Sequence, residues 1–260
     1  DVILTFFSLL TIICWIQWRK LEGTKGVFAY VGFLLSYCCV LLTKESGIIL
    51  PVLIMLVDYF FLKTLPHPLH TRKKVYLPLI LISVLYISVR INLLGSADLQ
   101  VRGLDFFPIV SGVIVTYSYY VKMLLFPVIQ TASPSILPFS SFKNPTFITS
   151  IALVGSLLVV TVSCWNRFRE LSFLILWFFV ALLPVSGIIP LPVPALEHRL
   201  YLGSVAFSMV IPLLYYKAIL TSTHESYTRS IPVVSLCILL ALITFYATKT
   251  VTRNTVWQNE

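Results

Sequence analysis

The stretch Val27–Leu42, VFAYVGFLLSYCCVLL, contains no charged side chain and decides the class of fold. The pair Lys44-Glu45 ends it. The apolar run before it, Val2–Gln17, leads directly into Trp18, Arg19 and Lys20. An aromatic ring followed by basic residues is typical of a membrane–water interface. A bilayer span needs about 20 apolar residues, with a range of about 17–25, so we interpret both runs as membrane helices.

The composition of the whole chain supports this interpretation. Of the 260 residues, 58% are hydrophobic and only 11% are charged, whereas a soluble domain is typically about 45–50% apolar and about 25% charged. The mean hydropathy is +0.94. A soluble fold of this size could not bury so much apolar surface. These values exclude a soluble enzyme, a disordered tail and a coiled coil, and they predict one transmembrane domain over residues 1–260 without a soluble domain.

Further apolar runs follow along the chain and predict an all-α, polytopic membrane protein with about eight transmembrane helices. The segment 106–130 is the exception, and we interpret it as interfacial or re-entrant. It contains Pro108 and Pro127, a group of tyrosines, and Lys122, which would be costly in the middle of a bilayer. The remaining runs are Gly47–Leu62, Val75–Leu94, Thr146–Trp165, Leu171–Pro190, Leu200–Leu220 and Ile231–Thr250.

The basic residues predict the orientation of the first half. Loops 18–26 and 63–74 are rich in Lys and Arg, so the positive-inside rule places them in the cytoplasm. In the second half the rule is indecisive. Four basic residues lie on each side of the membrane both if the segment 106–130 crosses the bilayer and if it does not. The net charge of +9 is spread over short loops, without a basic helix or an RNA-binding motif. We therefore expect the lipid bilayer, and not nucleic acid, as the partner.

The densest polar cluster in an apolar stretch is Glu197-His198-Arg199, followed closely by Tyr201. It combines a carboxylate, an imidazole, a guanidinium fork and a phenol. Such a set suits an anionic lipid head group or a leaving phosphate. The alternative is a loop that contains an internal Glu–Arg pair.

Three further charged positions are candidates, each with a structural alternative. Lys44 lies with Glu45 where two apolar runs meet, which is also typical of a solvated turn. Arg90 lies near the end of its run, where it could bind a ligand phosphate or reach lipid phosphates. Asp58 could be functional, or could reach water or Lys63 at the end of its helix. The four histidines and five cysteines form no metal-ligand pattern, so we expect no metal site.

The order of several short blocks resembles the membrane region of the transmembrane-and-tetratricopeptide-repeat proteins, and especially its bacterial members. That family is similar to GT-C type glycosyltransferases, including O-mannosyltransferases that use a polyprenyl-phosphate sugar. The resemblance covers nearly the whole chain. The blocks are Asp1-Val-Ile-Leu, Leu42-Thr43-Lys44-Glu45-Ser46-Gly47, Asp58-Tyr59, Leu85-Tyr86 with Arg90, Tyr120-Val-Lys122, Trp177-Phe178-Phe179, Glu197-His198-Arg199-Leu200-Tyr201 and Arg253-Asn254.

The resemblance implies a GT-C-like fold and transfer of a sugar from a polyprenyl-phosphate donor to a protein hydroxyl, without a cofactor. It implies lipid-phosphate binding by Arg199 and His198, with Glu197 orienting Arg199, and with Arg90 and Lys44 as second choices. The acidic residues that would activate the acceptor are expected upstream of Asp1, and the repeats after Glu260. The chain would then be a middle piece, inactive alone, of a protein in the bacterial inner membrane rather than the endoplasmic reticulum.

Two other functions fit the same residues. One is a non-catalytic membrane anchor or scaffold that binds only lipid phosphate. The other is a transporter or flippase core, which would have paired intramembrane charges and an internal repeat. The sequence shows few such charges and no repeat of that kind, so the transporter ranks third.

Overall fold

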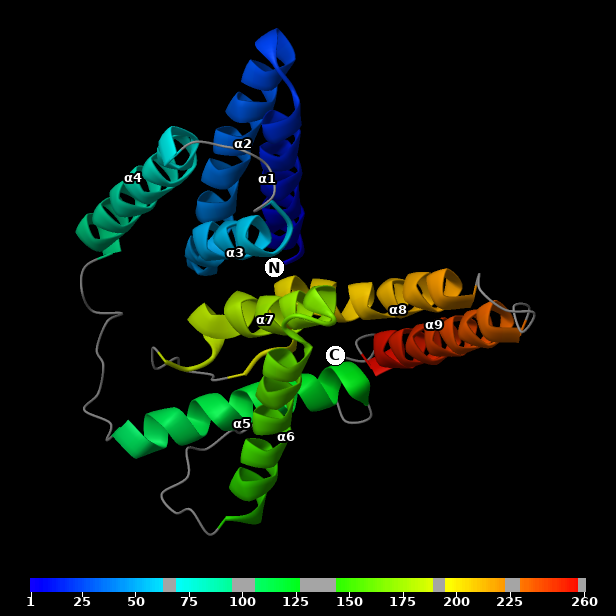
Figure 1. The fold of residues 1–260 in the computed structure, drawn as a ribbon. Coiled ribbons are helices and arrows are strands. Elements are labelled where there is room, and N and C mark those ends of the chain that lie inside the picture. The colour runs from blue at the N-terminus through cyan, green and yellow to red at the C-terminus, as the bar shows by residue number, and fades with distance from the viewer. Residues whose placement is uncertain (63–68, 95–105, 127–143, 189–194, 223–229, 257–260) are drawn as a thin grey trace.

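Helices make up nearly all of the computed structural model, which describes residues 1–62, 69–94, 106–126, 144–188, 195–222 and 230–256 (Figure 1). No strand occurs in these ranges, which confirms the all-α prediction. The helices are α1 (Val2–Lys20), α2 (Gly23–Thr43), α3 (Leu50–Val57), α4 (Leu69–Leu94), α5 (Phe106–Leu125), α6 (Pro145–Cys164), α7 (Arg169–Leu182), α8 (Tyr201–Ser222) and α9 (Ser230–Val256).

Six of the described helical segments are long and apolar enough to cross a bilayer, and they belong to α1, α2, α4, α5, α6 and α8. A polytopic helical membrane protein is therefore confirmed. Two of the other three helices are shorter, since α3 has 8 residues and α7 has 14. Helix α9 has 27 residues, and the apolar part found among its described residues is Leu239–Thr252. A full span needs about 20 residues, so among the described residues six helices meet this length and composition, and the number of about eight stays a prediction.

The core of the first half lies between α1, α2, α3 and α4. Trp15, Phe33 and Leu53 are fully buried there, and α1 and α2 lie side by side in Figure 1. The hydroxyls of Tyr37 and Ser83 share a hydrogen bond of 2.5 Å that joins α2 to α4. The Ser83 hydroxyl also donates to the Leu79 carbonyl at 2.7 Å, so Ser83 is the partner that satisfies the buried Tyr37 hydroxyl.

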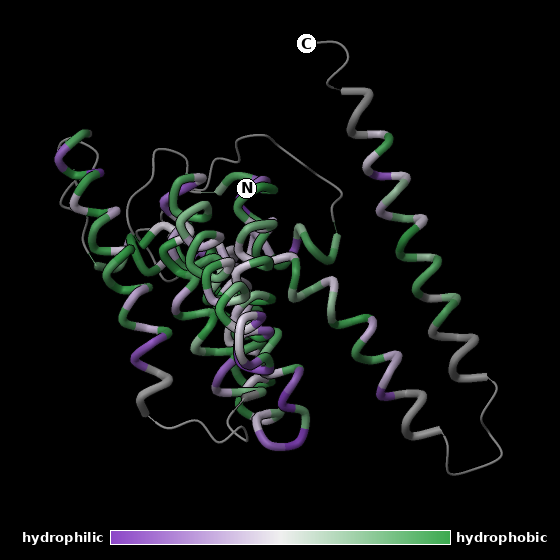
Figure 2. The backbone as a smooth tube through the Cα atoms, turned by 90° about the horizontal axis from the view of Figure 1, so that it is seen from above, coloured by the Kyte–Doolittle hydropathy of each residue, from purple (hydrophilic) through white to green (hydrophobic). Residues whose placement is uncertain are grey.

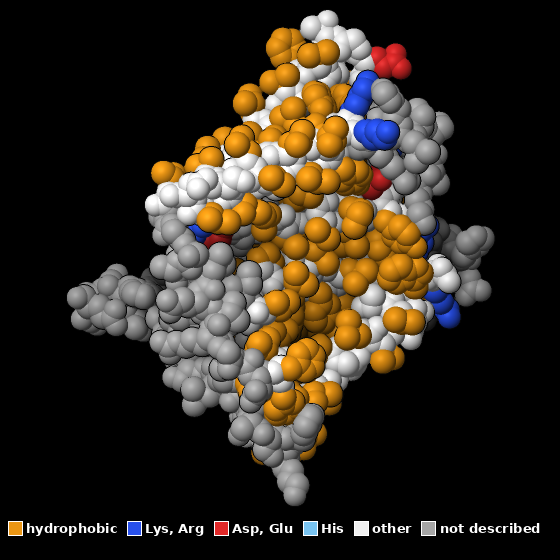
Figure 3. All heavy atoms as spheres, turned by 90° about the vertical axis from the view of Figure 1, so that its left-hand side faces the viewer, with side chains coloured by type: hydrophobic (Ala, Val, Ile, Leu, Met, Phe, Trp, Pro, Cys, Tyr) orange, Lys and Arg blue, Asp and Glu red, His pale blue; other side chains and the backbone are white. Residues whose placement is uncertain are grey.

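The outer surface of the bundle is apolar, as expected of a surface that faces lipid. On α4 only a narrow stripe is buried, formed by Val75, Leu79 and Ser83 at a spacing of four residues. Most of its other large apolar side chains, such as Leu81 and Leu85, are exposed. Figure 3 shows hydrophobic side chains over most of the described part of this face, with the few charged ones toward its edges. Contact with lipid chains is favourable for such a surface, whereas contact with water is not.

The polar contacts gather at two opposite ends of the bundle. The end that holds Arg19 and Asp58 is called the Arg19 end, and the guanidinium of Arg169 also reaches it by donating to the Phe60 carbonyl at 3.2 Å. The end that holds Asp1 and Lys44 is called the Lys44 end. In Figure 2 the N-terminus lies near the upper end and a hydrophilic connection, drawn in purple, lies at the lower end.

The positions of the two ends help to show whether the segment 106–130 crosses the membrane. Helix α4 finishes toward the Lys44 end, where Arg90 reaches Glu45. Helix α6 finishes at the Arg19 end, where Trp165 packs on Phe60 with ring centroids 5.2 Å apart, so α6 starts from the Lys44 side. This arrangement favours a segment 106–130 without a net crossing. Since α5 is itself long and apolar enough to span, its placement in the membrane stays a prediction.

Candidate functional site

The Lys44 end joins the start of α1 to the end of α2 through one ion pair. The ammonium Nζ of Lys44 donates to both carboxylate oxygens of Asp1, at 2.9 and 2.8 Å. The side chain of Asp1 is 8% exposed and that of Lys44 is 24% exposed. Because the pair is largely shielded from solvent, its charges interact more strongly than they would in water.

A tight turn places Lys44. Its extended backbone ends α2, and its carbonyl accepts a hydrogen bond of 3.1 Å from the N–H of Gly47, inside the 3₁₀ helix Glu45–Ile49. A Cβ atom at Gly47 would collide with a methyl group of Val40 and would lie 3.2 Å from Leu4. Glycine therefore lets the turn pack closely on α1 and α2, and this packing sets the position of Lys44.

A second short helix, Glu197–Leu200, brings the predicted Glu-His-Arg cluster to the same place. The Nε2 atom of His198 lies 3.5 Å from Oδ2 of Asp1. Burial lowers the pKa of Lys44, the nearby positive charge of Arg199 lowers it further, and the carboxylate of Glu45 opposes both effects. The fold thus brings together three of the predicted residues, Lys44, His198 and Arg199, from distant parts of the sequence.

The other two predicted residues lie around this group. Glu197 opens the short helix and is half-buried. Arg90 stands at the rim, where its Nη1 atom lies 3.5 Å from a carboxylate oxygen of Glu45 and 3.4 Å from the hydroxyl of Tyr86. The side chains of Arg90 and Glu45 are 37% and 57% exposed, so their pair is weaker than the pair of Asp1 and Lys44.

Sequence reasoning missed two residues of this site. Tyr120 of α5 is fully buried, and its hydroxyl bonds both the carbonyl of Leu196, at 3.2 Å, and the N–H of Leu196, at 3.3 Å. It therefore holds the backbone just before the Glu197–Leu200 helix. The tyrosine group in α5 was visible in the sequence, but its partner was not. Asp1 was noted only as part of a block, and only a search for a counter-ion to Lys44 could have pointed to it.

The Arg19 end has a different character. The Nη1 atom of Arg19 donates to Oδ1 of Asp58 at 3.3 Å, and the two side chains are 5% and 16% exposed. The ring of Trp15 lies 5.8 Å from the guanidinium. Asp58 thus has a structural partner in Arg19, which the sequence did not suggest, while Lys63 lies outside the described residues.

The described residues show no group of three His, Cys, Asp or Glu side chains that could hold a metal ion. His67 and His70 lie in or beside the undescribed segment 63–68, and their side chains are not described. The chemistry at the Lys44 end is therefore that of hydrogen-bond donors and paired charges: the cations Lys44, Arg90 and Arg199 stand among the acidic Asp1, Glu45 and Glu197.

The fold and this cluster define an all-α, multi-pass membrane protein with a polar site at one end of its helix bundle. Comparisons of the chain with protein-family models, with curated proteins and with solved structures gave no match. The resemblance to the transmembrane-and-tetratricopeptide-repeat proteins therefore depends on the quoted residue blocks alone.

Proposed function

We propose that the chain is the membrane segment of a GT-C-like glycosyltransferase and that its Lys44 end binds the phosphate of a polyprenyl-phosphate sugar. The observation that carries the proposal is that Lys44 and His198 meet at Asp1, while Arg199 lies close enough for its charge to act on both of them. Guanidinium, ammonium and imidazole groups are the donors that bind phosphate in proteins. Their position at the end of apolar helices suits a ligand with a charged head and a hydrocarbon tail.

The paired charges determine how a phosphate would enter. Lys44 already donates to Asp1, so an incoming phosphate competes with this carboxylate for the ammonium. Arg199 offers a fork of N–H donors that matches two phosphate oxygens at once. We therefore assign the main contact to Arg199, a supporting contact to His198, and a contact that depends on release from Asp1 to Lys44.

In the proposed reaction a carboxylate removes the proton from a Ser or Thr hydroxyl, the oxygen attacks the anomeric carbon of the sugar, and the lipid phosphate leaves with the bonding electrons. Arg199 and His198 stabilise the negative charge that develops on this phosphate. Both Asp1 and Glu45 are paired with cations, so neither is assigned as the base. The base belongs to the upstream acidic residues that the family resemblance implies.

The test is binding of a long-chain polyprenyl phosphate to the chain in nanodiscs of neutral phosphatidylcholine. Replacing Arg199 with Ala removes a charged hydrogen bond of about 1.5–3 kcal/mol, so we expect affinity to fall roughly 10- to 100-fold. Arg167→Ala is the matched control, because Arg167 is exposed next to α7 at the Arg19 end. Equal affinity of wild type and Arg199→Ala would remove Arg199 from the site, and no binding by wild type would refute the proposal.

The second candidate is a membrane anchor that binds lipid phosphate without turnover. The pairing of Asp1 and Glu45 with cations favours it, since these carboxylates are engaged and the site holds no free base among them. Sugar transfer by a longer protein that contains this chain, lost on Arg199→Ala, would support the transferase. Phosphate binding without transfer in that longer protein would support the anchor.

A further inference from the structure

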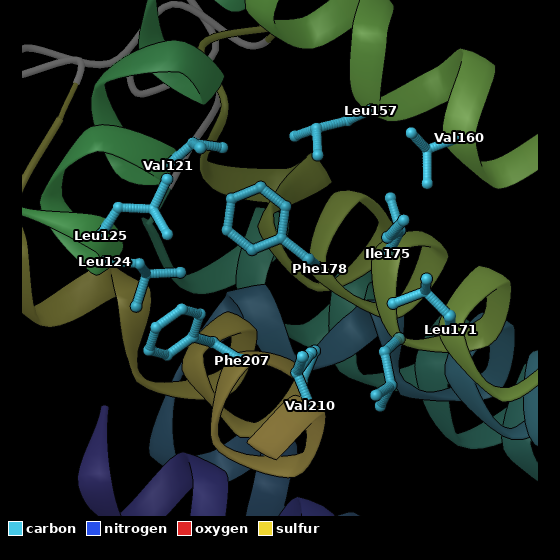
Figure 4. A pocket seen from close by; sticks show the side chains of 12 residues that line it. Val121, Leu124, Leu125, Leu157, Val160, Leu171, Ile175, Phe178, Phe207 and Val210 are labelled. Atoms are coloured by element: carbon cyan, nitrogen blue, oxygen red, sulfur yellow. The ribbon is translucent and has the colours of Figure 1, made fainter. Parts of the chain in front are cut away.

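A cavity of about 300 Å³ lies between α5, α6, α7 and α8 and is partly open to the outer surface of the bundle (Figure 4). All twelve residues that line it are apolar. Val121 comes from α5, Leu157 from α6, Phe178 from α7 and Ala206 from α8, and in Figure 4 the labelled side chains Val121, Leu157 and Phe178 surround the same space. None of the residues that line the cavity takes part in the side-chain polar contacts described above.

The lining decides what kind of molecule can fill this space. A water molecule needs two to four polar partners, and the lining residues carry no polar side chain. An apolar cavity of about 150 Å³ stays dry and binds benzene, and this cavity is about twice as large. A hydrocarbon segment is therefore the fitting occupant.

The cavity is connected to the Lys44 end by two helices. On α5, Tyr120 binds the backbone of Leu196, and the next residue, Val121, lines the cavity. On α8, Ala206 lies seven positions after Arg199, which is roughly 10 Å along a helix axis. A lipid phosphate at Arg199 would thus start its chain about 10 Å from the cavity, which is roughly eight carbon–carbon bonds of an extended chain.

We propose that this cavity binds the hydrocarbon chain of the same lipid whose phosphate binds at Arg199, and that Ala206 makes room for it. The inference rests on the proposed phosphate site. It adds that the tail leaves the head group between α5 and α8 and lies in the cavity between the helices, not on the exposed face of α8. A small side chain at position 206, which is 2% exposed, is needed because the chain passes against α8.

The test compares two probes on the full chain in phosphatidylcholine nanodiscs: a long-chain polyprenyl phosphate, and dimethylallyl phosphate, which has almost no tail. Ala206→Phe places a large ring in the cavity and reduces the space for a hydrocarbon chain, so we expect the affinity for the long-chain probe to fall about tenfold, equivalent to about 1.4 kcal/mol. The affinity for the short probe should not change. Met209→Phe is the control, because Met209 lies on α8 but is 53% exposed.

A second measurement covers the case in which Ala206→Phe does not fold. A long-chain polyprenyl phosphate with a photoreactive diazirine early in its chain should crosslink wild-type protein at Val121 or Phe207, and an excess of unlabelled probe should prevent this. Crosslinks only to exposed residues of α8, or equal labelling by a diazirine phosphatidylcholine, would overturn the inference. Failure of wild type to bind either phosphate probe would instead overturn the phosphate site itself.

Discussion

Asp58 lies where the α-helical hydrogen bonding of α3 changes to the π-helical segment Asp58–Leu62. Such segments are rare and occur often at functional sites, so the sequence-based suspicion about this carboxylate was reasonable. The structure gives Asp58 a partner in Arg19, with both side chains mostly buried. A buried charge without its partner is far more costly than the pair is favourable. We therefore assign Asp58 a structural role.

This assignment predicts a large loss of stability on Asp58→Ala, because the variant leaves the guanidinium of Arg19 buried without its counter-ion. We expect the free energy of unfolding in mixed micelles to fall by about 3 kcal/mol. Glu170→Ala is the control: its pair with Lys217, at 2.7 Å, is 43% and 28% exposed and should be worth less than about 1 kcal/mol. Equal effects of the two substitutions would contradict the role given to Asp58.

Tyr120 is a positioning residue, because it acts on the site through the backbone of Leu196. Tyr120→Phe keeps the ring and removes the hydroxyl, which leaves both groups of Leu196 without this partner. We expect polyprenyl-phosphate affinity to fall about fivefold, or about 1 kcal/mol. Tyr216→Phe, at an exposed ring of α8, should leave it unchanged. A purely structural Tyr120 would instead lower thermal stability while the folded protein kept full affinity.

At the scale of elements, the turn between α2 and α3 shows how one small residue controls a site. Gly47→Ala places a methyl group against Val40 and Leu4, and overpacking of this kind costs about 1–3 kcal/mol. We expect lower stability together with weaker phosphate binding, since the displaced turn carries Lys44. Thermal unfolding and probe binding measure the two effects.

Gly155→Ala provides the comparison for this turn. Gly155 lies inside α6, and a Cβ atom there meets no other atom within 4 Å. Alanine is favoured over glycine within a helix by roughly 0.5–1 kcal/mol, so this variant should be as stable as wild type or more stable. If Gly47→Ala behaved like Gly155→Ala, the close packing of the turn would not set the position of Lys44.

At the scale of the whole molecule, the two polar ends predict which residues share a side of the membrane. In a cysteine-free background, Asn166→Cys and Lys20→Cys should react with an impermeant maleimide from the same side, and Thr43→Cys from the opposite side. All three positions are exposed, at opposite ends of the bundle. Labelling of Asn166→Cys together with Thr43→Cys would mean that the segment 106–130 makes a net crossing.

The class of the protein was predictable from the sequence because it depends on local properties. Long uncharged runs such as Val27–Leu42 can satisfy their backbone hydrogen bonds in lipid only as helices, whatever their neighbours are. The polar candidates were also visible, since charged residues such as Lys44 and Arg199 are conspicuous in apolar surroundings. These candidates could be recognised without knowing how the helices pack.

Only the tertiary structure decided which of these residues meet. The pairing of Asp58 with Arg19 and of Lys44 with Asp1 depends on how α1 packs against α2 and α3, and no periodicity in the sequence encodes that choice. The apolar cavity is likewise a property of four helices together, since Val121, Leu157, Phe178 and Ala206 each look like ordinary core residues in the sequence. Local patterns determine the helices, whereas contacts between distant segments determine the partner of each buried charge and the space left between them.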